Sequence, residues 1–161
     1  MLDAGLAEFD LTQFLETAAQ KTCAAKIPVA AVAYKYGHAD LLRLWLRFMD
    51  RFSCWSQMLN DTLDWSKDSS HRQGTFFLSE AARRKRPDES PLEWVFREGL
   101  EWGMDTLEAW MLELKLLASD LECPDVLEYL HHRAGILSER KAALIRGSRD
   151  LAKLRSVLDG R

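Results

Sequence analysis

The longest periodic run in this sequence is DLLRLWLRFMDRFSCWSQMLNDTLDW, residues 40–65. Asp40 is suited to cap a helix, because its side chain can accept a hydrogen bond from an otherwise unpaired backbone N–H. The apolar residues that follow recur at three- and four-residue spacing, which is the spacing of one helix face. They are Leu41, Leu42, Leu44, Trp45, Phe48, Phe52, Trp55 and Leu59. The run predicts one long amphipathic helix that persists to about Trp65.

Helical signals continue upstream of this run. Asp10 and Thr12 are both good capping residues, and apolar residues then recur at helical spacing, so a helix is expected from about residue 11. Pro28 is expected to kink or break that helix, because proline removes a backbone donor and clashes with the preceding turn. Gly37 is expected to end the next apolar segment.

Downstream, the polar stretch 66–74 is expected to be a frayed helix end and a loop, and residues 75–83 a short helix. The basic run 83–89 has the composition of a linker. Ser-Pro-Leu-Glu at 90–93 combines a capping serine, a proline at the first helical position and a glutamate at the third. These residues predict the start of a long helix that runs to about residue 121. A last helix is expected over about 125–158, either continuous or broken at Gly135 or Gly147.

Composition supports an all-α fold and excludes several classes of protein. The chain has 161 residues, of which 47% are apolar, with only eight Gly and four Pro. This composition excludes disordered and collagen-like proteins. We expect one helical domain over 1–161, with helices over 11–80 and long C-terminal helices over 90–161. No period-two strand pattern is present.

Charge and cysteine content narrow the function classes further. The formal net charge is −3, which argues against nucleic acid as a partner, and the basic run 83–86 is better explained as a solvated linker. The three cysteines form no Cys-x-x-Cys pair, so neither a disulfide framework nor a zinc site is indicated. No transmembrane segment or signal-type leader is apparent, and we expect a cytoplasmic protein.

Oxygen-bearing side chains recur near the end of the long helix. They are Gln57, Asn60, Asp61, Asp64 and Asp68, whose spacing places them along one stripe of a helix. Asp64 and Asp68 repel each other on adjacent turns unless a cation lies nearby. Mg²⁺ prefers such oxygen ligands, with one or two carboxylates and the rest from water and phosphate. The stripe is therefore either a solvated acidic face or half of a magnesium shell.

These residues resemble the class I isoprenoid diphosphate synthases, which comprise the trans-prenyltransferases and the related terpene cyclases. The prenyltransferases carry Lys-Thr on one helix and Gln-x-x-Asp-Asp-x-x-Asp further along; this sequence has Lys21-Thr22 and then Gln57 to Asp64 at a similar separation. Residues 60–68 also resemble the Asn-Asp-x-x-Ser-x-x-x-Glu metal motif of the cyclases. The resemblance covers roughly residues 10–80 and is weaker beyond them.

The resemblance implies a helical bundle like the C-terminal half of the class I terpenoid synthase fold. It also implies Mg²⁺-dependent ionisation of an allylic prenyl diphosphate substrate, by condensation or cyclisation chemistry. The implied metal ligands are Asn60, Asp61, Asp64 and Asp68, and the implied diphosphate-binding residues are Lys21, Thr22, Gln57 and Arg72. Trp55, Trp65, Phe76 and Phe77 are candidate walls of an aromatic cavity, with ordinary core packing as the alternative.

Two departures from the family pattern shape the expected function. Asn60 stands where the prenyltransferases have an aspartate, and residues 1–20 hold no Asp-Asp-x-x-Asp, the family's first metal motif. The chain thus looks like one half of such an enzyme, expected to form a homo-oligomer or to pair with a partner helical half. The alternative is a non-catalytic helical interaction module, because half of such a bundle would expose apolar surface.

Overall fold

Two of the capping residues predicted from sequence, Asp10 and Ser90, start helices where expected. The computed structural model describes residues 9–159, with side chains described over 9–148 and at 150. The Asp10 side chain accepts from Gln13 N–H while the Gln13 side chain accepts from Asp10 N–H, and Ser90 and Glu93 form the same reciprocal capping box. Gly37 has φ of +77°, the left-handed conformation that glycine adopts most easily.

The regular elements of the described chain are all helical, which confirms the predicted fold class. Their bounds are α1 (Leu11–Lys21), α2 (Cys23–Lys35), the 3₁₀ turn η1 (Ala39–Leu41), α3 (Leu42–Leu63), α4 (Trp65–Ser70), α5 (Phe76–Arg84), α6 (Pro91–Trp94), the π-helical turn η2 (Val95–Gly99), α7 (Leu100–Asp120) and α8 (Pro124–Asp159).

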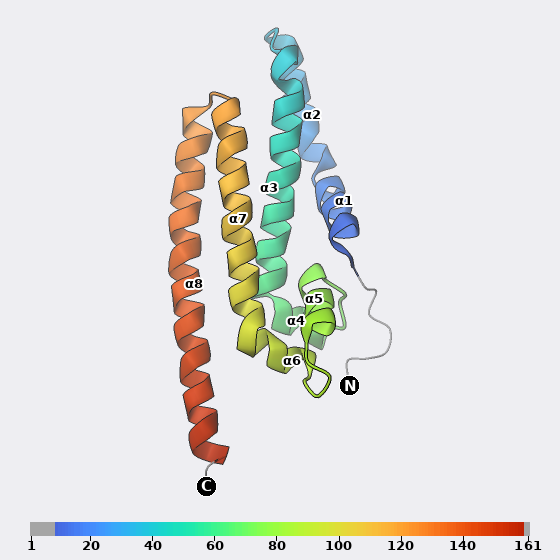
Figure 1. Ribbon diagram of the computed structural model, residues 1–161. Coiled ribbons are helices and arrows are strands. Elements are labelled where there is room, and N and C mark those ends of the chain that lie inside the picture. The colour runs from blue at the N-terminus through green and yellow to red at the C-terminus, as the bar shows by residue number, and fades with distance from the viewer. Residues whose placement is uncertain (1–8, 160–161) are drawn as a thin grey trace.

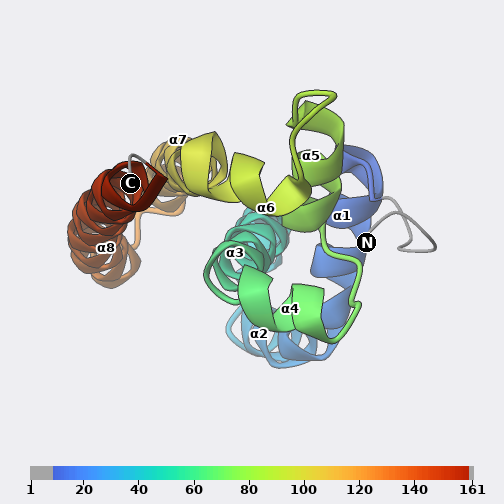
Figure 2. The same cartoon turned by 90° about the horizontal axis from the view of Figure 1, so that it is seen from below.

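The three longest helices, α3, α7 and α8, lie side by side (Figure 1). Viewed along these helices, α8, α7 and α3 form a curved row, and α1 and α2 cover α3 on the side away from α8 (Figure 2). The short helices α4, α5 and α6 gather at one end of α3, close to the start of α1. Helix α7 is the centre of the packing, because it contacts both α3 and α8 extensively.

The core lies mainly between α3 and α7. Trp55 is 1% exposed, and its indole Nε1 donates a hydrogen bond to Leu107 O at 3.0 Å. Burying a large apolar side chain of this kind contributes about 1.5–3 kcal/mol. Helix α7 approaches α3 closely at Gly103, where a Cβ atom would lie 2.7 Å from Thr62 Cγ2. Glycine at position 103 therefore leaves room for the buried Thr62 side chain.

The break in the first helical segment lies at Thr22, and the expectation that it would fall at Pro28 is wrong. Thr22 has φ of −107° and ψ of 13°, which ends α1, whereas Pro28 lies inside α2. The Thr22 hydroxyl lies 2.6 Å from Ser53 Oγ and donates to Ala19 O, so tertiary contact with α3 favours the break at this residue.

The long run 40–65 also differs in detail from its prediction. Asp40 lies inside η1, and α3 begins at Leu42 without a side-chain cap. At the other end α3 stops at Leu63, Asp64 takes a non-helical conformation, and α4 forms within the predicted loop. Asp68, the last residue of the acidic stripe, therefore belongs to a second, short helix.

The predicted linker 83–89 is shorter than expected, because α5 continues through Arg84. Arg83 and Arg84 both bind the Glu80 carboxylate, and the Arg84 guanidinium lies 4.6 Å from the Trp102 ring centroid. These contacts extend the helix into the basic run. Pro124 begins α8 instead of only ending α7, and α8 runs through Gly135 and Gly147 without a break.

Candidate functional site

A cavity of about 440 Å³ lies between α1, the end of α3, α4 and the start of α5. Its lining brings together segments that are more than thirty residues apart in the sequence. The lining residues are Phe9, Phe14, Thr17, Ala18, Lys21, Gln57, Asn60, Asp61, Asp64, Asp68, Gln73, Gly74, Thr75 and Phe76. Six of the eight predicted site residues are among them. Lys21 is the only lysine or arginine in this lining.

A chain of hydrogen bonds crosses one wall of the cavity. Lys21 Nζ, on the last turn of α1, donates to Gln57 Oε1 on α3 at 3.1 Å. Gln57 Nε2 in turn donates to Asp61 Oδ1 at 2.6 Å. The amide thus joins the cation of one helix to the carboxylate of another, and it holds the Lys21 ammonium beside the cavity. Such a preorganised cation suits the binding of an anion.

Asp61 lies at the buried end of this chain, with only 3% of its surface exposed. Burial raises the pKa of the Asp61 carboxyl to about 6, against the opposing effect of the hydrogen bond from Gln57. The nearby Asp68 carboxylate also raises this pKa, while the Lys21 ammonium and the Phe76 backbone N–H lower it. The Asp61 carboxyl is therefore a group that can hold or release a proton near neutral pH.

Asn60, Asp64 and Asp68 line the same cavity and carry no side-chain hydrogen bond or ion pair with another described residue. Burial, and then the neighbouring Asp64, raise the pKa of the Asp68 carboxyl. This repulsion follows from the local geometry, because Asp68 N–H donates to Asp64 O at 3.0 Å and one helical turn separates the two residues. A cation between the two carboxylates would relieve it.

The donor set of these three residues fits Mg²⁺, which takes one or two carboxylates and fills its octahedron with water and phosphate. Among the described residues, no three His, Cys, Asp or Glu side chains gather in a group that could hold a metal. The set here is two carboxylates and one amide oxygen. Asp61 differs from the other three, because one of its oxygens already accepts from Gln57.

Two predicted diphosphate-binding residues lie outside the cavity lining. The Thr22 hydroxyl lies 2.6 Å from Ser53 Oγ on α3 and donates to Ala19 O on α1. Arg72 is exposed in the turn after α4, with φ of +55°. Neither side chain lines the cavity with Lys21 and Gln57.

The aromatic residues of the cavity also differ from those predicted. Only Phe76 of the four candidates lines it. Trp55 and Phe77 are core residues with 1% and 0% exposure, and Trp65 packs edge-on against Phe96.

Phe9 and Phe14 are the aromatic lining residues that sequence reasoning missed. Phe9 precedes the Asp10 cap and Phe14 follows it at the fourth helical position. Apolar residues at these two positions form the hydrophobic staple that often accompanies a capping box. This signal was available in the sequence.

Comparison with known proteins adds no relative: no family model matches the chain, and neither a curated protein nor a solved structure is similar to it. Within the part of the chain that the structure describes, no helix is both long enough and apolar enough to cross a membrane. The site must therefore be interpreted from its own geometry.

Proposed function

We propose that this protein binds prenyl diphosphates with Mg²⁺ and acts as part of an isoprenoid diphosphate synthase-like enzyme that ionises an allylic diphosphate. One observation carries the proposal. The Lys21 end of α1 and the segment from Gln57 to Asp68, which resemble two separate motifs of that family, line one cavity. Nothing in the spacing of residues 21 and 57 along the chain requires the two segments to meet.

In this proposal Asn60, Asp64 and Asp68 hold Mg²⁺, and Lys21 and Gln57 bind diphosphate oxygens. Bound Mg²⁺ neutralises the charge of the diphosphate and makes it a better leaving group. The Lys21 ammonium, held by Gln57, stabilises negative charge as it develops on the departing oxygen. Phe14 and Phe76 line the same cavity, so an allylic cation formed there would lie beside aromatic side chains, which favour it electrostatically.

The enzyme in this proposal is complete only with a second helical half, from another copy or from a partner chain, that supplies further metal ligands. Binding is therefore the property to test first. Isothermal titration calorimetry with pyrophosphate should show binding that requires Mg²⁺ and is lost in Asp64→Ala and Asp68→Ala. Asp120→Ala, at an exposed aspartate at the end of α7, is the matched control and should bind like the wild type. Absence of binding by the wild type at any Mg²⁺ concentration would refute the proposal.

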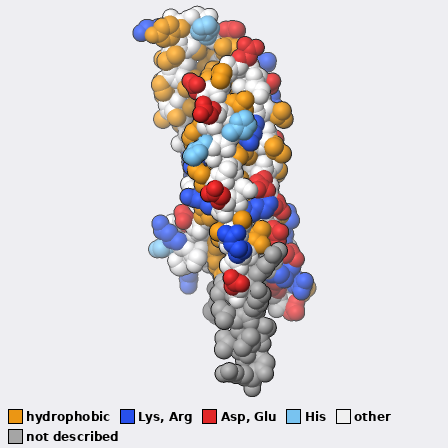
Figure 3. Space-filling view, turned by 90° about the vertical axis from the view of Figure 1, so that its left-hand side faces the viewer, with side chains coloured by type: hydrophobic (Ala, Val, Ile, Leu, Met, Phe, Trp, Pro, Cys, Tyr) orange, Lys and Arg blue, Asp and Glu red, His pale blue; other side chains and the backbone are white. Residues whose placement is uncertain are grey.

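A non-catalytic interaction module is the second candidate, and the surface of α2 favours it. This helix has apolar residues on every side, yet only Ala33 is buried. Ile27, Val32 and Tyr34 are 69%, 56% and 68% exposed. A helix that is apolar all round is normally covered by other parts of a protein. By contrast, the face over α8 mixes acidic, basic and apolar side chains (Figure 3).

Self-association measured by light scattering, taken together with pyrophosphate binding, separates the two candidates. The interaction module predicts a dimer or larger species that Ile27→Glu converts to a monomer, with no binding of pyrophosphate. Ala109→Glu, on the exposed side of α7, is the control and should leave the assembly unchanged. A wild-type monomer at all concentrations would exclude self-association through α2.

A further inference from the structure

The chemistry of Lys21 and Asp61 fixes the orientation of the Gln57 amide that lies between them. The Lys21 ammonium can only donate hydrogen bonds, and an ionised carboxylate such as that of Asp61 can only accept them. The amide therefore directs Oε1 toward Lys21 Nζ, at 3.1 Å, and Nε2 toward Asp61 Oδ1, at 2.6 Å. Reversal of the amide would place donor against donor at Lys21 and acceptor against acceptor at Asp61.

Two donors hold the Asp61 carboxylate in place. Besides Gln57 Nε2, the backbone N–H of Phe76 interacts with it. Phe76 is the first residue of α5, so its N–H has no partner within the helix and lies at the end of the helix that favours an anion. Asp61 is only 3% exposed, so little water competes for either contact. The carboxylate is thus held from both α3 and α5.

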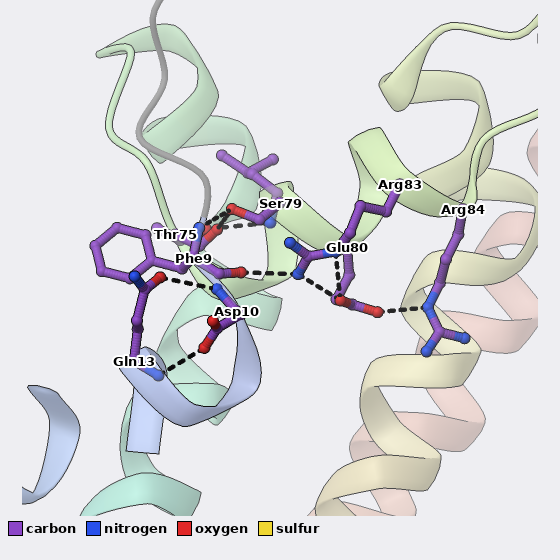
Figure 4. A network of polar contacts seen from close by, with 9 residues as sticks. Phe9, Asp10, Gln13, Thr75, Ser79, Glu80, Arg83 and Arg84 are labelled. Atoms are coloured by element: carbon purple, nitrogen blue, oxygen red, sulfur yellow. Dashed lines mark hydrogen bonds and ion pairs between the residues drawn. The ribbon is translucent and has the colours of Figure 1, made fainter. Parts of the chain in front are cut away.

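Polar contacts also join the start of α5 to the start of α1 (Figure 4). Phe9 N–H donates to Ser79 Oγ at 3.0 Å, and Arg83 Nη2 donates to Phe9 O at 2.7 Å. Ser79 Oγ donates in turn to the backbone oxygen of Thr75, the residue that caps α5, at 2.9 Å. These contacts tie α5 to the beginning of α1, the helix that ends at Lys21.

Lys21 itself gains order from its contact with Gln57. Its side chain is long and exposed, and such a side chain loses much rotamer freedom when it is held at a binding site. Ordering one side chain of this kind costs about twofold to tenfold in affinity. The hydrogen bond to Gln57 places the ammonium beside the cavity before a ligand binds.

We propose that Asp61 is a positioning residue: its carboxylate fixes the orientation of the Gln57 amide, and the amide holds the Lys21 ammonium where the diphosphate binds. The inference rests on the proposed function and gives Asp61 a role other than the metal ligand that the family resemblance implies. The negative charge of Asp61 by itself repels a diphosphate, so removal of that charge alone would tighten binding. Loss of positioning weakens binding, and the two effects therefore have opposite signs.

Asp61→Asn tests the inference, because asparagine has the shape of aspartate but only one oxygen for the two donors. The variant can no longer hold the Gln57 amide in a single orientation. Pyrophosphate, titrated calorimetrically into the full chain at pH 8 with saturating Mg²⁺, should bind the variant about twofold to tenfold more weakly than the wild type. Asp120→Asn, at an exposed aspartate at the end of α7, is the matched control and should bind like the wild type.

The same substitution in a Lys21→Met background separates positioning from a metal-binding or structural role. With no ammonium to hold, Asp61→Asn should not weaken binding further. If Lys21→Met binds too weakly to measure, Gln57→Met replaces it, because it also breaks the link between Asp61 and Lys21. Weaker binding in this background as well, or no weakening in the wild-type background, would overturn the positioning role alone. Failure of the wild type to bind pyrophosphate with Mg²⁺ would overturn the proposed function and this inference together.

Discussion

Replacing Asp61 by asparagine should remove a large pH dependence of stability. The pKa of the Asp61 carboxyl rises from 3.8 to about 6 on folding, chiefly because the group is buried. Each pKa unit corresponds to about 1.4 kcal/mol, so the shift of about two units amounts to roughly 3 kcal/mol. The folded state holds this proton more tightly than the unfolded chain. The stabilisation is therefore complete below pH 3.8 and is lost as the pH rises through about 6.

Asparagine has the same shape and no charge, and its Oδ1 can still accept from Gln57 Nε2. We expect wild type and Asp61→Asn to have similar free energies of unfolding at pH 4. At pH 8 the variant should be more stable, by up to about 3 kcal/mol. Urea denaturation in the presence of a chelator, repeated at several pH values, measures this difference. Asp120→Asn is the control and should follow the wild type within about 0.5 kcal/mol. Parallel stability curves for wild type and Asp61→Asn from pH 4 to 8 would refute the reasoning.

Two further predictions concern packing and the loop before α6. Gly103→Ala should destabilise the protein by about 1–3 kcal/mol in urea denaturation, because the new Cβ would lie 2.7 Å from Thr62 Cγ2. Gly135→Ala should instead stabilise the protein by about 0.5–1 kcal/mol, because a Cβ at that position would have no atom within 4 Å. Hydrogen bonds from Arg97 lower the pKa of Glu89 to about 2, so its stabilising contribution is lost as the pH falls from 4.5 through about 2. Glu89→Gln should therefore lower the thermal unfolding midpoint at pH 6 and have little effect at pH 2.

The helical fold was predictable because its signals are local. A capping box spans four residues, as at Asp10 and Ser90, and the apolar periodicity of α3 repeats every turn. The boundaries that failed depend on contacts between distant residues. Thr22 ends α1 through its bond with Ser53, and Arg84 extends α5 by packing on Trp102.

In the candidate site, too, some features were predictable from the sequence and others depend on contacts between distant residues. Resemblance to two motifs selected Lys21 and the residues from Gln57 to Asp68, and they line one cavity. The burial of Asp61 could not be read from the sequence, because its neighbours in the chain resemble those of the exposed Asp64. Phe9 belongs to the cavity because Ser79 and Arg83, seventy or more residues away, hold its backbone.

By itself, the sequence determined that this protein is helical, where most helices begin, and which oxygen-bearing side chains recur near the end of its longest apolar run. Tertiary structure alone decided which of those side chains are desolvated and which aromatic side chains line the cavity beside them. Hydrogen bonding within a helix depends on residues three or four positions apart. Desolvation and charge pairing depend on the distance between segments that meet only after the chain has packed.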